Sequence, residues 1–323
     1  MLRALVRHRV VWRVAGMLGT LLGVAVFVFV TLRAIPGDQI TAGLGTEAAA
    51  LTPAQREALE RYYGLDQSPF TQFFSWLGNM FSGNFGYSAR SQQSVLDLTL
   101  HSLPVTFELA VFSIVLALLI GVPLGMLAAS RTNSARDALG QIVSLGGLSI
   151  PSFLLATTLL SVLAASFGFN PNGQGFAGPL DDPLLNLQQM FLPALVLGFG
   201  IAAPILRTTR TAVLEVRSND FVRTARAKGV PPRRLQVRHV LGNALVPIVT
   251  MTGLQFGYLL GGAVVVEQVF SVPGIGRQVL LGIQQKEYAV VQSTVLVIAL
   301  AFVIVNLLTD LLYRIIDPRV RAS

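Results

Sequence analysis

The side chains that could perform catalysis or bind a metal are few in this chain and lie far apart. The 323 residues include no cysteine, which excludes thiolate metal sites, disulfides and cysteine nucleophiles. The three histidines, His8, His101 and His239, are too scattered to predict a metal cluster. The motifs G-x-x-x-x-G-K-[ST], H-E-x-x-H and G-x-S-x-G are also absent from the sequence. We therefore expect a protein that is not an enzyme and that binds no cofactor or metal.

Three carboxylates, Glu108, Glu267 and Asp310, lie near long apolar segments. All three fall at predicted helix ends, which favours interfacial or capping roles over a polar pathway through a membrane. An intramembrane enzyme needs convergent catalytic groups, and an ion-coupled secondary transporter usually carries charge at the membrane midplane. Both classes stay open as alternatives, but neither has its usual signature here.

The composition is that of a membrane protein with several spans. Hydrophobic residues make up 53% and charged residues 12% of the chain, and the mean hydropathy is +0.64. The charged residues leave six gaps that could cross a bilayer, at 14–32, 109–130, 138–180, 183–206, 239–266 and 288–309. Pro and Gly residues after 170 limit the third helix to about 138–166. We predict one all-α domain, 1–323, with six transmembrane helices, and a retained first helix rather than a signal peptide.

The positions of Lys and Arg predict the orientation. The 207–238 stretch holds nine basic residues against Glu215 and Asp220, the segment before the first span has four arginines and no acid, and 167–190 has no base. By the positive-inside rule, both termini and the 207–240 loop lie in the cytoplasm, whereas 33–102 and 267–287 are extracytoplasmic. The formal net charge of +8 therefore reflects topology rather than nucleic-acid binding.

The 33–102 loop is predicted to hold two short helices. Thr52 and Gln55 form a capping box that begins the first helix, and Gly64 follows its end. The second begins at Ser68-Pro69 and carries an apolar aromatic stripe with Trp76 near its edge. The stripe consists of Phe70, Phe73, Phe74, Leu77, Met80 and Phe81. A helix at the membrane interface or packed on the bundle is favoured, and a patch that contacts the substrate is the alternative.

The cytoplasmic stretch TARAKGVPPRRLQVRH, residues 224–239, is predicted to form a short helix with defined ends. Ser218 or Asn219 can cap it, Gly229 suits its C-terminal end, and Pro231-Pro232 prevents its continuation. A helix of about 10 residues is marginal alone in water, so it must dock on something. Anionic lipid would explain the arginines, but a protein partner explains both the charge and the ends.

Small residues recur every fourth position in three predicted spans. Internal packing is favoured for two of the pairs, Gly19/Gly23 and Gly121/Gly125. For Gly253, Gly257 and Gly261, packing on a partner subunit, a wall of the translocation path and internal packing all stay open.

The 221–247 segment, FVRTARAKGVPPRRLQVRHVLGNALVP, resembles the EAA loop of bacterial ABC importer permeases, in particular the dipeptide/oligopeptide/nickel branch. RAIPGD, RYYGLDQSP, LPVTFELA, EQVFSVPGIGR and DLLYRIIDPRVR are similar to that branch along nearly the whole chain. The long first outer loop favours the first permease of the pair. Arg223 and Thr224 stand where the general motif has Glu and Ala, and Gly242 replaces a proline.

The resemblance implies a type I ABC importer fold and an ATP-driven importer of dipeptides or oligopeptides in the bacterial inner membrane. Nickel chelates, haem or glutathione are alternative solutes. It also implies a second permease, two ATPase domains that hold ATP and magnesium, and an extracytoplasmic binding protein. The residues expected to couple to the ATPase are Phe221, Arg223, Thr224, Ala225, Arg226, Ala227, Lys228 and Gly229. Those expected on the translocation path or partner interface are Gly253, Gly257, Gly261, Glu267, Pro273 and Gly274.

Overall fold

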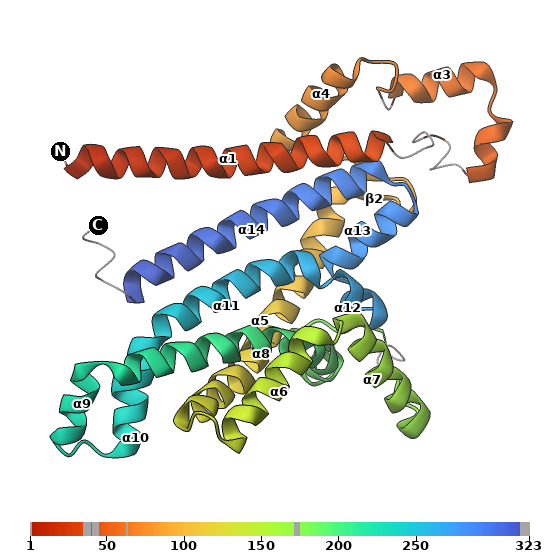
Figure 1. Ribbon diagram of the computed structural model, residues 1–323. Helices are drawn as coiled ribbons and strands as arrows, with labels where there is room; N and C mark the ends of the chain where they lie inside the picture. The colour runs from red at the N-terminus through yellow and green to blue at the C-terminus, as the bar shows by residue number, and fades with distance from the viewer. Residues whose placement is uncertain (1, 35–39, 41–44, 63, 171–174, 317–323) are drawn as a thin grey trace. The chain divides into compact units, whose positions relative to one another are not determined.

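The computed structural model describes residues 2–34, 40, 45–62, 64–170 and 175–316, and these residues are almost entirely helical (Figure 1). The first part of the chain contains α1 (Leu2–Ala34), the 3₁₀ helix η1 (Gly45–Ala50), α3 (Pro53–Tyr62), α4 (Pro69–Phe81), and the antiparallel strands β1 (Tyr87–Ser88) and β2 (Gln93–Ser94). Next come α5 (Val95–Ser130), α6 (Ala135–Ser149), α7 (Ser152–Phe167), α8 (Pro183–Ser218), α9 (Asp220–Ala227) and α10 (Pro232–Arg234). The last part contains the π-helix η2 (Leu235–Leu241), α11 (Gly242–Gly262), α12 (Val264–Val269), α13 (Ile275–Gln284) and α14 (Tyr288–Ile316).

Five described helical segments are long and apolar enough to cross a membrane: 14–34, 95–130, 183–218, 232–261 and 288–309. A sixth candidate span is the pair α6 and α7, which is bent by 95° at its break. With that pair taken as one span, the predicted number of six and the all-α membrane fold are confirmed. The break follows from Pro151, since a residue before proline is driven out of the helical region. Ile150 is accordingly extended, with φ −86° and ψ 116°.

One predicted boundary was wrong. The helix expected to begin at 109 begins at Val95, because Asp97 and His101 are tolerated on a helix that continues beyond the apolar segment. The resulting helix of 36 residues is about 54 Å long, more than a bilayer core requires. The connection 267–287 contains the short helix α13, which the sequence did not predict because Arg277 interrupts the apolar pattern.

The chain divides into two compact units. The first comprises residues 1–104 and 274–303, and the second comprises 105–273 and 304–323. In the first unit, Val28 and Leu32 of α1 pack on Tyr288 and Val291 of α14. The Glu287 carboxylate accepts hydrogen bonds from the Ser88 hydroxyl (2.9 and 3.0 Å) and the Arg90 backbone N–H (3.0 Å), so it holds the β1–β2 hairpin.

The second unit is built around α8, which packs on α6, α7 and α11 and has 17 buried residues. Glycines permit close approach at its surface. A Cβ on Gly125 would lie 2.6 Å from Thr209 Cβ, and one on Gly121 would lie 2.8 Å from the Ala202 carbonyl oxygen. These two glycines therefore pack internally, whereas a Cβ on Gly19 or Gly23 would meet no atom of the described residues within 4 Å beyond the nearby backbone of α1.

Candidate functional site

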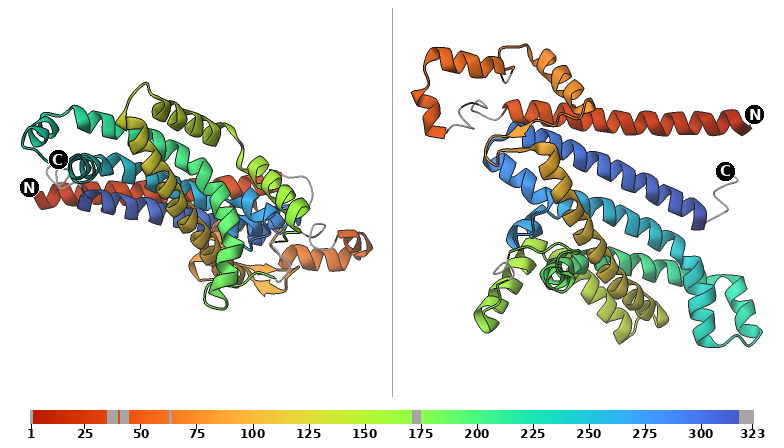
Figure 2. Two further views of the ribbon diagram at one scale, coloured as in Figure 1. Left: turned by 90° about the horizontal axis from the view of Figure 1, so that it is seen from below. Right: turned by 180° about the vertical axis from the view of Figure 1, so that it is seen from behind.

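The candidate site is α9 with the turns that bound it, at one end of α8 and α11 (Figures 1 and 2). Asn219 occupies both the end of α8 and the start of α9, in an extended conformation with φ −72° and ψ 146°. The chain therefore passes from α8 into α9 through this single residue. Asp220 places a negative charge in the first turn, where the helix dipole favours it. The Thr224 hydroxyl donates a hydrogen bond to the Asp220 carbonyl oxygen at 3.0 Å.

A glycine ends α9 in the way the sequence predicts. Gly229 has φ +76°, its N–H donates to the Arg226 carbonyl at 3.0 Å, and the Val230 N–H donates to the Ala225 carbonyl at 3.2 Å. This pair of bonds is the Schellman arrangement, which satisfies carbonyls that the helix leaves unpaired. Pro232 then occupies the first position of α10, where its missing N–H has no consequence. The helix has eight residues, two fewer than predicted.

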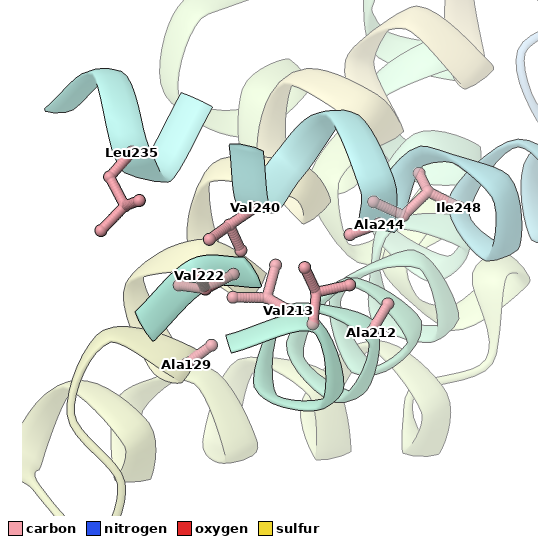
Figure 3. Close-up of a cluster of buried hydrophobic side chains, with 9 residues drawn as sticks. Ala129, Ala212, Val213, Val222, Leu235, Val240, Ala244 and Ile248 are labelled. Carbon is pink, nitrogen blue, oxygen red and sulfur yellow. The ribbon is translucent and has the colours of Figure 1, made fainter. Parts of the chain in front are cut away.

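One face of α9 packs on the rest of the second unit (Figure 3). Val222 is 1% exposed and lies among apolar side chains from α5, α8, η2 and α11, which are Ala129, Ala212, Val213, Val216, Leu235, Val240, Ala244 and Ile248. Ala225, three residues later on the same face, packs at the edge of this cluster. Since both residues contact their own chain, α9 is attached rigidly to the membrane-spanning helices.

The other face of α9 is open. Of the eight residues predicted to couple to a partner, seven are exposed: Phe221, Arg223, Thr224, Arg226, Ala227, Lys228 and Gly229. Ala225 is the exception, since it is half-buried against its own chain. The exposed face is cationic and also carries the aromatic side chain of Phe221. This composition suits an interface with another protein.

Two arginines near the end of α8 that leads into α9 fasten α8 to α6 and α5, and the sequence did not single them out. Arg210 donates to both carboxylate oxygens of Asp137 at 2.8 and 2.9 Å, and Asp137 also accepts the Asn133 N–H at 3.0 Å. Arg217 donates to the Ala129 carbonyl oxygen at 2.6 Å. Bidentate pairing fixes orientation as well as distance. The sequence feature that could have indicated this pair is Asp137 itself, which is the only acidic residue beside Arg136 at the start of a predicted span.

The residues predicted on the translocation path or partner interface lie on other elements. A Cβ on Gly253 would lie 2.0 Å from Thr309 Cγ2, so this glycine packs α11 against α14. Gly257 is also buried, whereas a Cβ on Gly261 would meet none of the described neighbouring helices within 4 Å. Glu267 is fully buried in α12 and accepts a 2.6 Å hydrogen bond from the Thr106 hydroxyl.

Pro273 and Gly274 form the turn before α13 and take no part in the α9 site. Gly274 precedes the first residue of α13 in an extended conformation with φ −85°, which does not demand glycine. Among the residues that the structure describes, no group of three or more His, Cys, Asp or Glu side chains is placed to hold a metal ion.

Comparison with known proteins gives matches along nearly the whole chain. Residues 121–322 match the family described as "Binding-protein-dependent transport system inner membrane component", and residues 1–110 match the N-terminal domain described for the same kind of membrane component. The glutathione transport system permease protein GsiC of Escherichia coli K12 is 36% identical over 312 residues, 97% of this chain and 98% of GsiC. BOV_A0351 of Brucella ovis, provisionally named a peptide permease protein, is 39% identical over 310 residues, 95% of this chain and 96% of that protein. A solved amino acid ABC transporter has 15% identity and a TM-score of 0.47, over 69% of this chain and 94% of the transporter chain.

Proposed function

Since the chain belongs to the family of binding-protein-dependent inner membrane components and is a permease subunit of an ABC importer, we propose that α9 is its coupling helix. In this proposal, ATPase subunits bind the exposed face of α9 and use ATP and magnesium held in their own chains. The observation that carries the proposal is the division of α9 into one face buried in its own bundle and one open cationic face.

The attachment of α9 explains how movement would pass to the membrane. A helix of eight residues cannot keep its shape alone, but Val222 and the Asn219 turn join it to α8 and α11. The Arg210–Asp137 pair joins α8 to α6 in the same unit. A displacement of α9 by closing ATPases would therefore move several helices together, as a rigid-body change between inward-facing and outward-facing states requires.

The proposed solute is a peptide. Two relatives that match nearly the whole chain are named for glutathione, which is a tripeptide, and for peptides. We propose dipeptides or oligopeptides, with glutathione as the first alternative and nickel chelates or haem as alternatives within the same branch. An extracytoplasmic binding protein would deliver the solute, and a second homologous permease would complete the pathway.

The proposed orientation places α9 and both termini in the cytoplasm and the α3–α4 region outside. Support comes from the nine basic residues in 207–238 against two acids, because short cytoplasmic loops retain positive charge. In this orientation α9 is on the side where ATP is available.

The docking of α9 can be tested with Phe221→Asp and Ala227→Asp, which alter only its exposed face. Transport of a labelled tripeptide would be measured with the whole complex in proteoliposomes. We expect a fall of about tenfold or more, since an unpaired charge in a packed interface is strongly unfavourable. The chain should still insert in the membrane in normal amounts.

Ala54→Asp provides the matched control, because it adds the same charge to an exposed alanine in the first turn of α3. It should leave transport unchanged. Wild-type transport by both α9 variants would show that the exposed face of α9 is not the docking surface.

A further inference from the structure

The first unit contains a cavity of about 600 Å³ that the coupling function does not use. It lies between the end of α1, the α3–α4 region, the β1–β2 hairpin and the beginning of α14. This volume falls in the range of sites for small organic ligands, about 300–1,000 Å³. All its lining residues belong to the first unit.

The polar face of α4 lines this cavity. Gln72, Ser75, Trp76 and Asn79 follow the spacing i, i+3, i+4, i+7, so they form one stripe of the helix, and all four are lining residues. The cavity therefore faces amide, hydroxyl and indole groups along two turns of α4, from Gln72 to Asn79.

Three phenylalanines of α4 are directed away from the cavity, whereas Phe73 packs on Phe29 of α1. Phe70, Phe74 and Phe81 are 79%, 65% and 87% exposed, and none of them lines the cavity. A helix on a water-soluble protein would turn its apolar face inward and its polar face to solvent. Here the four residues of the polar stripe line the cavity, although Ser75 and Asn79 are also exposed, so the wall that α4 contributes suits a polar ligand.

Two hydrogen-bond donors at the cavity have no acceptor. Gln292 of α14 is 6% exposed, and its Nε2 is buried without a partner among the described residues; the same holds for Trp76 Nε1. Both residues line the cavity. A buried unsatisfied donor costs about 1–3 kcal/mol. An acceptor supplied by a ligand would remove that penalty.

The charge of the cavity wall is positive. Arg33 and Arg61 are lining residues, and the described lining contains no Asp or Glu. Arg61 is paired with Glu57, so Arg33 is the cation that a ligand would meet. The Gln72 Oε1 atom accepts hydrogen bonds from Arg33 Nη2 and Nε at 2.5 and 3.1 Å, and the Phe29 ring lies 3.5 Å from the Arg33 guanidinium carbon. These contacts orient the guanidinium.

We propose that this cavity binds a small peptide-type solute through its carboxylate, which pairs with Arg33. Trp76 and Gln292 donate to the solute, and the amides of Asn79 and Asn84, which also line the wall, supply donors and acceptors for its peptide groups. The choice of a peptide rests on the proposed function. A lipid phosphate would use the donors but would leave the amide acceptors unused.

Tryptophan fluorescence can test the proposal, because the chain has only two tryptophans. Trp12→Phe leaves Trp76 as the only reporter, at the cavity wall. The full-length variant in nanodiscs of neutral lipid would be titrated with trialanine and with its C-terminal amide. We expect a saturable change with trialanine and binding weaker by about tenfold or more for the amide, which lacks the charge. This comparison needs no change to the cavity.

Two variants locate the binding in the Trp12→Phe background. Arg33→Gln should weaken trialanine binding by about tenfold or more, and Gln292→Leu by several-fold. Arg90→Gln is the matched control, since Arg90 is exposed and does not line the cavity, and it should bind like the parent. Equal affinity for acid and amide, no saturable change, or equal affinity in Arg33→Gln and Arg90→Gln would overturn the proposal.

Inorganic phosphate and dihexanoyl phosphatidylglycerol distinguish the source of the anion. If either displaces trialanine at equal or lower concentration, the cavity is a lipid or phosphate site and the proposal is wrong. A transport assay distinguishes the failure of the cavity proposal from the failure of the proposed function. If peptide uptake persists although no peptide binds near Trp76, the cavity proposal is wrong and the proposed coupling function stands.

Discussion

α9 and α4 are both short amphipathic helices next to membrane-spanning helices, yet they use their two faces in opposite ways. α9 buries Val222 in its own bundle and exposes a cationic face. α4 exposes Phe70 and Phe74 and directs its polar stripe to a cavity in its own unit. Each helix therefore has one face toward its own chain and one face toward its surroundings. The chemistry of the outward face differs between the two helices.

The difference indicates what each helix meets outside the chain. A cationic outward face is readily hydrated, and it suits contact with a water-soluble protein partner. An outward row of phenylalanines suits the lipid or apolar surroundings at a membrane interface. In unit 1, α4 contacts the end of a membrane span, since the Phe29 and Phe73 rings lie 5.1 Å apart. The position of α4 beside α1 is therefore consistent with its outward chemistry.

The largest effect should follow from reversing the inward chemistry of α9. Val222→Asp would place an unpaired carboxylate in the apolar cluster, at an expected cost of about 3 kcal/mol or more in the free energy of unfolding. Thermal unfolding of the purified chain in detergent measures it. Ala227→Asp, on the exposed face of the same helix, serves as the control and should unfold like the parent. Equal stability of the two variants would contradict the division of α9 into two faces.

A smaller but clear loss should follow at the ion pair between α8 and α6. Asp137→Asn keeps the shape of the side chain but removes the charge that holds Arg210 at 2.8 and 2.9 Å. We expect a lower midpoint of thermal unfolding, by several degrees, and weaker coupling of ATP hydrolysis to transport. An Arg210→Met variant and the double variant complete a cycle. If the two single effects add without interaction, the pair does not fasten α8 to α6.

The glycines of α11 should separate into two classes. Gly253→Ala places a Cβ against Thr309 and should destabilise the chain by about 1–3 kcal/mol, an overpacking effect. Thr309→Ala should relieve much of it. Gly261→Ala, where space is open, should change stability by about 0.5 kcal/mol or less. A destabilising Gly261→Ala would show that this end of α11 is also closely packed.

The smallest effect is expected on the outward face of α4. Phe70→Ser and Phe74→Ser should leave thermal stability in detergent nearly unchanged, within about 0.5 kcal/mol each, because both side chains are exposed. In liposomes the same variants should show reduced quenching of Trp76 by brominated lipids if α4 lies at the interface. Unchanged quenching would exclude lipid as the surroundings of this face.

Local sequence features allowed the caps of α3, α4 and α9 to be predicted. The Thr52 and Ser68 caps form as predicted, with the Gln55 and Thr71 N–H groups each donating at 3.3 Å. Gly229 adopts the positive φ that its position after α9 suggested. These features depend on residues within a few positions of one another, so composition and spacing suffice. The six spans and the family follow for the same reason, because charge-free runs and continuous motifs are local.

Longer-range features were not accessible from the sequence. The Arg210–Asp137 pair joins residues 73 positions apart, and Gly253 meets Thr309 on another helix. The sequence allowed Ala225 to face a partner, but packing turned it toward its own chain. Likewise, the sequence did not show that Gln72, Ser75, Trp76 and Asn79 line a cavity whose other walls come from distant segments.

The sequence by itself determined that this protein is a permease with several membrane spans and where α3, α4 and α9 begin. The tertiary structure decided which face of each helix is inward and which side chains from distant segments meet there. The physical reason is that helix ends and hydrophobic periods arise from neighbouring residues. Burial and pairing arise from contacts that only the folded chain creates.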